Sequence, residues 1–362
     1  MIIAIYIIFL FLILRFTVTL FNFISDPKLR RVNRDLPDLV SILIPVRNEE
    51  DNILTLLNSV LEQEHGHYEV IILDDDSTDG TYQLCSDFCS QHPQFRVIKG
   101  EPLPDGWLGK NFACHQLAKA AKGKYLLFVD ADEQLYSGLI SAAVYRMQLR
   151  RLALLSLFTD QDMRTIGERM VVPLMHYVLL NLLPIKLIYL SKNPGFSAAS
   201  GQFMLFDAAV YKRYQWHEMA RDRVVEDVEI MKLLKWKGEK GESLLANGLI
   251  SCRMYTGFSS AISGFSKNFL AAFNYNIFGF ICYLLVILGG PMLIFATLNV
   301  QLILMLCGLI ILTRIMISLS SGQNAFYNVV LHPLQMLSLL ILGISAIQNH
   351  LTRKNVWKGR PV

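Results

Sequence analysis

The chain has 362 residues, of which 53% are apolar and 18% are charged, and its 34 Lys and Arg against 30 Asp and Glu leave a net charge of +4. This apolar composition provides enough hydrophobic surface to form a core, which excludes an intrinsically disordered protein. The low fraction of charged residues argues against an ordinary soluble protein. A charge of +4 without a stripe dense in Lys and Arg is too weak to indicate a nucleic-acid partner.

The chain begins with a nearly continuous apolar segment, residues 2–24. About 20 helical residues cross the hydrocarbon core of a bilayer, so this segment predicts a transmembrane anchor in a first domain at residues 1–25. A cleaved signal peptide is the alternative, but no basic residues precede the apolar run and no A-x-A site follows it. Four basic residues come next: Lys28, Arg30, Arg31 and Arg34. Because Lys and Arg accumulate on the cytoplasmic side, the central region is expected in the cytoplasm.

The central region alternates short apolar strands with helical segments. The predicted strands are residues 40–44, 69–73, 96–98 and 125–129, and the predicted helices are about 49–63, 78–90 and 111–121. This alternation indicates βαβ units, so the predicted fold class is α/β with a mostly parallel sheet. Three of the strands end in polar signatures, which begin at Pro45, Asp74 and Asp130. Open α/β sheets bind ligands at the carboxyl ends of their strands, so we expect these signatures to converge on one crevice.

Acidic clusters at strand ends suit a divalent cation or the hydroxyl groups of a sugar better than a bare phosphate. Asp130 and Asp132 are separated by one residue, and together their side chains could contact a sugar nucleotide and its Mg²⁺ or Mn²⁺ ion. For each cluster alone, a turn with a capping aspartate is the structural alternative. Gly109-Lys110 lacks the Walker pattern, no G-x-G-x-x-G follows the first strand, and no Cys/His set has zinc-ligand spacing.

Three segments resemble, in order and spacing, the signatures of family 2 glycosyltransferases, the inverting enzymes with the GT-A fold. They are residues 41–50 (SILIPVRNEE), 70–81 (VIILDDDSTDGT) and 128–132 (FVDAD). The resemblance covers roughly residues 38–270 and implies a GT-A domain over that range. One departure is Asp76, where the family usually has Gly, and it concerns turn geometry.

The resemblance implies a role for each donor-site residue. Pro45 and Glu49 would flank the nucleotide base and ribose, and Asp75 would accept a hydrogen bond from the base, most often uracil. Lys110 would contact the diphosphate, and Asp130 would lie at the donor sugar and ribose. The expected donor is therefore a nucleotide sugar, with a UDP-sugar as the first choice.

Metal and base complete the implied site. Asp132 would bind the Mg²⁺ or Mn²⁺ ion that stabilises the departing diphosphate. Inversion needs a carboxylate that takes the acceptor proton, and the family places it in a Glu-Asp pair, here Glu226-Asp227. Apolar residues at helical spacing over 228–234 put this pair at the start of a helix, whose dipole favours the ionised form. We expect Asp227 to be the base and Glu226 its support; acidic residues that only stabilise a first turn are the alternative.

The C-terminal third carries three more apolar segments, and residues 275–350 are expected to form a C-terminal transmembrane region. The segments are residues 277–298, 300–319 and 329–347, the last interrupted by Pro333. The first two predict membrane spans, whereas the third predicts a span, a re-entrant segment or an interfacial one. The basic tail contains Arg353, Lys354, Lys358 and Arg360. This tail favours a cytoplasmic C-terminus. If all three C-terminal segments crossed the membrane, the tail would lie outside, so we favour a third segment that does not cross.

Another apolar stretch, residues 171–190, is punctuated by polar residues and prolines. It predicts a helix at the membrane surface, with a buried core helix as the alternative.

Apolar segments at both ends would hold the crevice at the membrane, which favours a lipid acceptor. Further resemblance to the membrane glycosyltransferases of hopanoid and carotenoid pathways lies in residues 102–113, 253–255 and 264–268. No Q-x-x-R-W signature ends at Trp236, so a processive polymerase is disfavoured.

The sequence therefore predicts a metal-dependent hexosyltransferase of the inner membrane, multi-pass, with a cytoplasmic catalytic domain. It would transfer one sugar to a lipid acceptor with inversion. One alternative is a polyprenyl-phosphate sugar synthase, for which Arg221 and Arg223 could supply a basic acceptor pocket. The other is a non-catalytic membrane scaffold with a decayed domain.

Overall fold

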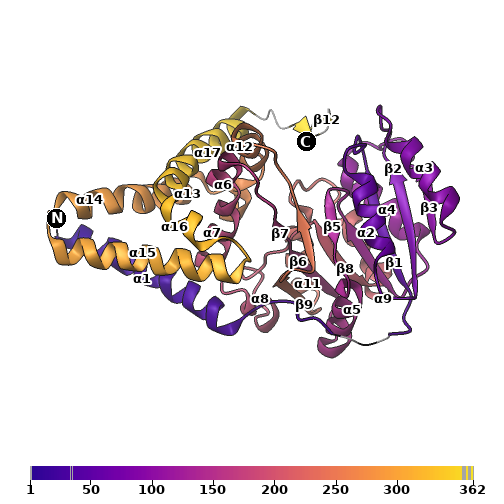
Figure 1. The fold of residues 1–362 in the computed structure, drawn as a ribbon, viewed down its shortest axis with the longest axis horizontal. Coiled ribbons are helices and arrows are strands. Elements are labelled where there is room, and N and C mark those ends of the chain that lie inside the picture. The colour runs from indigo at the N-terminus through magenta and orange to yellow at the C-terminus, as the bar shows by residue number, and fades with distance from the viewer. Residues whose placement is uncertain (1, 33, 35, 353–355, 358–359, 362) are drawn as a thin grey trace. The chain divides into compact units, whose positions relative to one another are not determined.

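The computed structural model describes residues 2–32, 34, 36–352, 356–357 and 360–361. These residues form two compact units, labelled by element in Figure 1. The helical unit combines the chain up to Asp26, Gln161–Ile185 and the described residues from Met254 to Thr352. The α/β unit contains Pro27–Asp160, Lys186–Arg253 and the described residues from Val356 onward. Three basic residues on which the expected side of the C-terminus depends lie outside the described residues: Arg353, Lys354 and Lys358.

A seven-stranded sheet in the order β3-β2-β1-β4-β8-β6-β9 forms the centre of the α/β unit. Its strands are β1 (Val40–Val46), β2 (Tyr68–Asp74), β3 (Phe95–Lys99), β4 (Tyr125–Val129), β6 (Leu154–Phe158), β8 (Phe203–Asp207) and β9 (Gly241–Leu245). β3, β2, β1 and β4 run parallel, as do β6 and β9, whereas β8 is antiparallel to both of its neighbours. The prediction of an α/β fold with a mostly parallel sheet is therefore confirmed, and β2, β1 and β4 present their carboxyl ends side by side.

Helices cover this sheet, and the strands are buried as the apolar sequence predicts. The helices are α2 (Ile53–Leu61), α3 (Thr81–Gln91), α4 (Gly109–Ala120), α5 (Leu139–Arg150), α8 (Lys186–Leu190), α9 (Ala208–Tyr214), α10 (Trp216–Met219) and α11 (Glu226–Trp236). Every residue of β4 is buried, as are six of the seven residues of β1. A strand covered on both faces has no need of alternating polar residues, which explains the continuous apolar runs.

Pro45 lies inside β1, one residue beyond the predicted end of that strand. The backbone N–H of Val40 faces β2 and donates to His67 O at 3.0 Å, so by alternation the nitrogen of Pro45 faces β4. β1 pairs with β4 only as far as Leu43. The missing N–H of Pro45 therefore costs no ladder hydrogen bond, and the strand continues toward the crevice.

A short antiparallel ladder joins β5 (Glu133–Leu135) to β10 (Ile250–Cys252) and places Cys252 opposite Glu133. β7 (Asp160–Gln161) marks the point in the sequence where the chain leaves the α/β unit. Two further short strands, β11 (Val356–Trp357) and β12 (Arg360–Pro361), pair with each other.

The helical unit contains four helices long and apolar enough to cross a membrane: Ile2–Ser25, Ile277–Ala296, Val300–Ser320 and His332–Thr352. They correspond to α1 (Ile2–Ser25), α13 (Ile277–Leu284) with a π-helical turn and α14 (Gly290–Ala296), α15 (Val300–Ser320) and α17 (His332–Thr352). The shorter elements are α6 (Ile166–Val171), α7 (Pro173–Leu182), α12 (Phe258–Ser266), the 3₁₀ turn Phe269–Phe273 and α16 (Ala325–Val330).

The expected membrane-surface helix of residues 171–190 is divided among α6, α7 and α8. α7 packs against α1 and α15, and seven of its ten residues are buried, including His176 and Asn181. The structure therefore favours the alternative, a buried helix, for this stretch.

Candidate active site

Lys110 brings together three segments that are far apart in the sequence. It lies in the first turn of α4, and its Nζ is 2.7 and 2.9 Å from the two carboxylate oxygens of Asp130, which follows β4. The same Nζ is 3.6 Å from Oε1 of Glu226, the first residue of α11. Burial lowers the pKa of Lys110, but the carboxylates of Asp130 and Glu226 raise it well above its usual value, so the ammonium stays charged.

Gly201 lies among these charged side chains. Its backbone N–H donates to Oδ2 of Asp227 at 2.8 Å, and the N–H of Val228 donates to Oδ1 at 2.7 Å. A Cβ added at Gly201 would stand 3.1 Å from Glu226 Oε1 and 3.2 Å from Lys110 Nζ. The backbone therefore approaches the carboxylates at a distance that a larger residue would disturb.

Burial makes both carboxylates of the Glu-Asp pair more basic. It raises the pKa of Glu226 to about 7, although Lys110 acts in the opposite direction. Burial also raises the pKa of Asp227, although the N–H groups of Val228 and Gly201 and the charge of Lys110 favour its ionised form. Burial thus outweighs the helix N-terminus that was expected to favour ionisation, and a raised pKa suits a general base that works near neutral pH.

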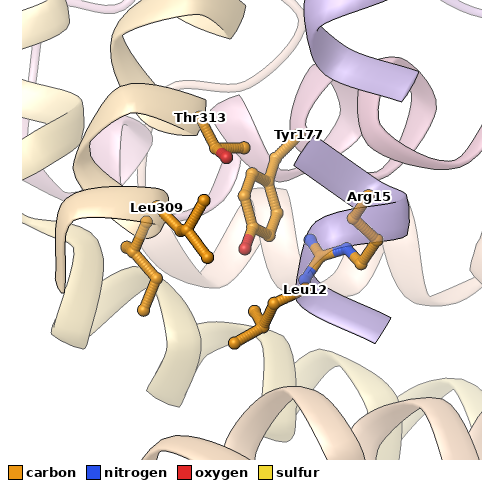
Figure 2. Close-up of a pocket in the computed structure, with 6 residues that line it drawn as sticks. Leu12, Arg15, Tyr177, Leu309 and Thr313 are labelled. Atoms are coloured by element: carbon orange, nitrogen blue, oxygen red, sulfur yellow. The ribbon is translucent and has the colours of Figure 1, made fainter. Parts of the chain in front are cut away.

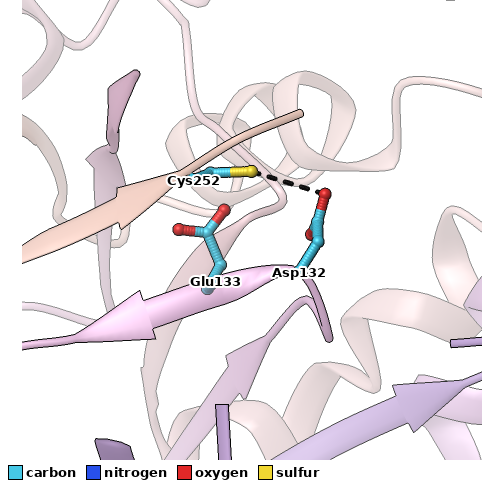
Figure 3. Close-up of side chains that lie close together, drawn as sticks. All are labelled: Asp132, Glu133 and Cys252. Carbon is cyan, nitrogen blue, oxygen red and sulfur yellow. Dashed lines mark hydrogen bonds between the residues drawn. The ribbon is translucent and has the colours of Figure 1, made fainter. Parts of the chain in front are cut away.

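Asp132 lies in a second acidic cluster with Glu133 and Cys252 (Figure 3), and one ligand atom from each lies within 4.8 Å of the others. The thiol of Cys252 donates to Oδ2 of Asp132 at 3.4 Å, and Nε2 of Gln202 donates to Oε1 of Glu133 at 2.6 Å. The other oxygen of Glu133 is buried and has no hydrogen-bond partner among the described residues. Burial, Asp130 and then Glu49 raise the pKa of Asp132 to about 6.

The donor set of this cluster fits a hard divalent cation through its carboxylates. Lys110 pairs with Asp130, whereas among the described residues Asp132 and Glu133 form no ion pair, and one oxygen of Glu133 has no hydrogen-bond partner there. A divalent cation would balance that charge, and carboxylate oxygens are the ligands that Mg²⁺ and Mn²⁺ prefer. Burial raises the pKa of Cys252 well above its usual value, so this residue is a neutral thiol and a hydrogen-bond donor.

The loops that follow β1 and β2 are tied to each other at the same edge of the sheet. Asp75 N donates to Val46 O at 2.8 Å, the Arg47 guanidinium donates to Asp75 O, and Glu49 N donates to Thr81 Oγ1 at 2.8 Å. These bonds place Glu49 and Asp75 on neighbouring loops. The negative charge of Glu49 also contributes to the raised pKa of Asp132.

Some acidic residues of the second signature serve the turn itself. Asp74 Oδ2 accepts from Ser77 N at 3.4 Å, and Asp79 Oδ1 accepts from Thr81 N at 3.0 Å. Asp74 and Asp79 therefore stabilise this turn, whereas the N-cap position of α3 is Gly80, which makes no side-chain capping bond. Asp76 has a φ of 59°, in the left-handed region that glycine adopts most readily, which explains why its position favours Gly in the family.

Sequence reasoning missed Glu133, Gln202 and Cys252 as neighbours of Asp132. Glu133 is adjacent in sequence, but its alignment with Cys252 depends on the register of β5 with β10. Gln202 comes from the segment before β8 and reaches Glu133 from 69 residues away. No spacing rule relates these three positions, so only the folded chain reveals them.

Comparisons with known proteins agree with this geometry. Residues 41–215 match the model of glycosyl transferase family 2. The 4,4'-diaponeurosporenoate glycosyltransferase of Staphylococcus haemolyticus is 27% identical over 63% of this chain and 60% of its own length. The dolichyl-phosphate beta-glucosyltransferase of Saccharomyces cerevisiae is 36% identical over 30% of this chain and 36% of its own length. This chain thus spans less than two thirds of either relative.

The fold is also that of a solved glycosyltransferase. The mannosyltransferase PcManGT from Pyrobaculum calidifontis, in complex with GDP-Man and Mn²⁺, superposes with a TM-score of 0.58 at 15% sequence identity. The match covers 97% of this chain and 100% of that one. The chain therefore contains a domain that matches glycosyl transferase family 2, and it has the GT-A fold.

Proposed function

We propose that this protein is an inverting glycosyltransferase that moves one sugar from a nucleotide sugar, with UDP-sugars first, to a lipid acceptor. The observation that carries the proposal is the meeting of Lys110, Asp130, Glu226 and Asp227 around Gly201. We retain residues 38–270 as the catalytic domain, with an anchor at 1–25 and a transmembrane region at 275–350. Its expected place is the inner membrane, with the catalytic domain in the cytoplasm.

The proposed donor site lies at the carboxyl ends of β2, β1 and β4. Pro45 and Glu49 flank the base and ribose, and Asp75 accepts a hydrogen bond from the base. Lys110 turns from Asp130 toward the diphosphate when the donor binds, which leaves Asp130 to accept hydrogen bonds from the sugar and ribose. The support for this arrangement is that Lys110 is charged, half-buried and already within 3 Å of Asp130.

Asp132 and Glu133 would hold the Mg²⁺ or Mn²⁺ ion, whose charge would stabilise the diphosphate leaving group. Asp227 would take the proton of an acceptor hydroxyl while the acceptor oxygen bonds to the anomeric carbon and the bond from that carbon to the diphosphate breaks. The N–H groups of Gly201 and Val228 would hold the Asp227 carboxylate in place. Glu226 would keep Lys110 near the diphosphate.

A lipid acceptor is supported by two findings. Four of the described helices are long and apolar enough to cross a membrane. A relative whose alignment covers 63% of this chain is a 4,4'-diaponeurosporenoate glycosyltransferase. Hopanoid- and carotenoid-type lipids are therefore the first acceptors to test.

The test is release of UDP from UDP-glucose and other UDP-sugars by the purified full-length chain in detergent with a lipid extract. We expect release to require Mg²⁺ or Mn²⁺, to fall at least about 100-fold in Asp227→Asn, and to be lost in Asp132→Ala. Glu229→Gln is the matched control, because Glu229 lies in the same turn of α11 and pairs with Lys232 at 3.6 Å. Equal rates in all four proteins would support the non-catalytic scaffold instead.

A polyprenyl-phosphate acceptor is the second candidate, because Arg221 and Arg223 are exposed beside α4. The backbone oxygen of Arg221 accepts from Leu108 N at 2.9 Å, next to the turn that carries Lys110. Mild acid distinguishes the products of a labelled donor, since a polyprenyl-phosphate sugar is acid-labile and most lipid glycosides survive. An acid-labile product that disappears in Arg221→Gln would favour this candidate.

A further inference from the structure

Two arginines are buried in the helical unit without a carboxylate partner. Arg15 of α1 is 5% exposed and Arg314 of α15 is 1% exposed. Residues 2–25 and 254–362 contain no Asp or Glu, and among the described residues neither arginine forms an ion pair. Burying a cation without a counter-ion is costly, and arginines within membrane segments are rare and usually functional.

Tyr177 of α7 lies between the two guanidinium groups. The guanidinium carbon of Arg15 is 5.0 Å from the centre of the Tyr177 ring, and that of Arg314 is 4.6 Å away. Cation–π contacts of this kind offset part of the cost of burial but leave the net charge in place. The interior between α1, α7 and α15 is therefore positively charged.

The two arginines differ in how well their hydrogen bonds are satisfied. Arg314 donates from Nε to Asn328 O at 3.1 Å and from Nη2 to the side chain of Gln335. Arg15 donates from Nε to Asn181 Oδ1 at 3.1 Å, but its Nη2 is buried and has no hydrogen-bond partner in the part of the chain that the structure describes. The hydrogen bond to Asn181 joins α1 to α7 and gives Arg15 a structural role. It does not explain why Nη2 of Arg15 is buried without a hydrogen bond.

A small cavity adjoins Arg15. It has a volume of about 10 Å³ and is lined by Leu12, Arg15, Tyr177, Leu309, Ile310 and Thr313. Figure 2 shows the Arg15 side chain pointing toward Tyr177, with Leu12 and Leu309 beside the same space. A cavity of this volume accommodates about one water-sized group, which is the size of one oxygen atom of an oxyanion.

We propose that this cavity binds one oxygen of the anionic group of an apolar lipid, a carboxylate or a phosphate, with Arg15 as the donor. Leu12, Leu309 and Ile310 also line the cavity, and their apolar side chains suit a ligand whose charged group is attached to a hydrocarbon chain. Because all of the contacts lie within the helical unit, this site does not depend on the proposed glycosyltransferase activity.

The test is equilibrium binding of radiolabelled oleate to the purified full-length chain in detergent. We expect saturable binding that weakens at least 10-fold in Arg15→Gln, which removes the charge. The same loss is expected in Leu12→Phe, which fills the cavity and leaves the Arg15–Asn181 bond intact. Leu10→Phe is the matched control, because Leu10 lies on the same helix and is 60% exposed. Melting curves of all variants show whether they are folded.

Competition identifies the chemistry of the ligand. Unlabelled oleate and lysophosphatidate should displace the probe, whereas oleyl alcohol, which has the tail without the charge, should not. Displacement by acetate or inorganic phosphate at the same concentrations would show that the tail is dispensable and would overturn the lipid assignment. Binding of oleate that is unchanged in both Leu12→Phe and Arg15→Gln would overturn the site itself.

Discussion

At the scale of single residues, the carboxylate of Asp227 has the clearest expected effect on catalysis. Asp227→Asn keeps the shape and removes the proton acceptor, so kcat should fall by about 10²–10⁴-fold while the KM for the donor stays nearly unchanged. Because burial raises the pKa of Asp227, the wild-type rate should fall on the acidic side at a pH above the usual range for aspartate. Initial rates measured between pH 4 and 9 check both effects. If the residual rate of Asp227→Asn fell at the same acidic pH as the wild-type rate, Asp227 would not be the base.

Glu226 gives a prediction about stability. Burial raises its pKa in the folded chain to about 7 from 4.5, so the folded state holds this proton more tightly than the unfolded state. That stabilisation is fully present below pH 4.5 and is lost as the pH rises through 7. Glu226→Gln removes the cost of the buried charge, so it should raise Tm at pH 8 by about 2–4 °C and leave Tm at pH 4.5 unchanged.

The control for this measurement is Glu229→Gln. Glu229 lies on the same helix but is not among the groups that shift the pKa of Glu226. Its change in Tm should be the same at both pH values. A Glu226→Gln variant that is destabilised more at pH 8 than at pH 4.5 would show that the ion pair with Lys110 outweighs burial.

At the scale of elements, α11 does more than present the Glu-Asp pair. Lys235 at its C-terminal end is buried, and its Nζ donates to Ser191 O at 3.0 Å and to Phe196 O at 2.6 Å. The loop so held leads directly to Ser200 and Gly201. Lys235→Met should therefore speed hydrogen exchange of the amides in residues 192–201 at least several-fold and lower kcat. Lys232→Met, three residues earlier on the same helix, should leave that exchange unchanged.

Elements with local signals were predictable from the sequence, and contacts set by strand pairing were not. β4 has the predicted bounds because its five apolar residues are bracketed by polar ones. β1 runs past its predicted end because whether a proline interrupts a strand depends on the neighbouring strand. The ladder of β5 with β10 joins residues more than 110 positions apart, so the contact of Asp132 with Cys252 left no local pattern.

At the scale of the whole molecule, the sequence and the structure identify the same four apolar segments, but their number of crossings is still a prediction. α1, the helix over Ile277–Ala296 and α15 have mean hydropathies of 2.4 to 2.5, whereas α17 has 1.3. α17 also carries the buried polar residues Gln335 and Ser338. A helix with this composition is the one of the four least suited to cross the bilayer.

The expected arrangement is three crossings, with the central region and the C-terminus both in the cytoplasm. Two variants test this arrangement: one carries a cysteine at the exposed position Ser137, and the other carries a cysteine in a C-terminal tag. Both cysteines should react with a membrane-impermeant maleimide in inside-out vesicles, and neither should react in right-side-out cells. The chain without an added cysteine measures the background of its six native thiols, none of which forms a disulfide. If the tag reacts only in right-side-out cells while Ser137→Cys reacts only in inside-out vesicles, all four helices cross. Lys28, Arg30 and Arg31 would then set the orientation without help from the C-terminal tail.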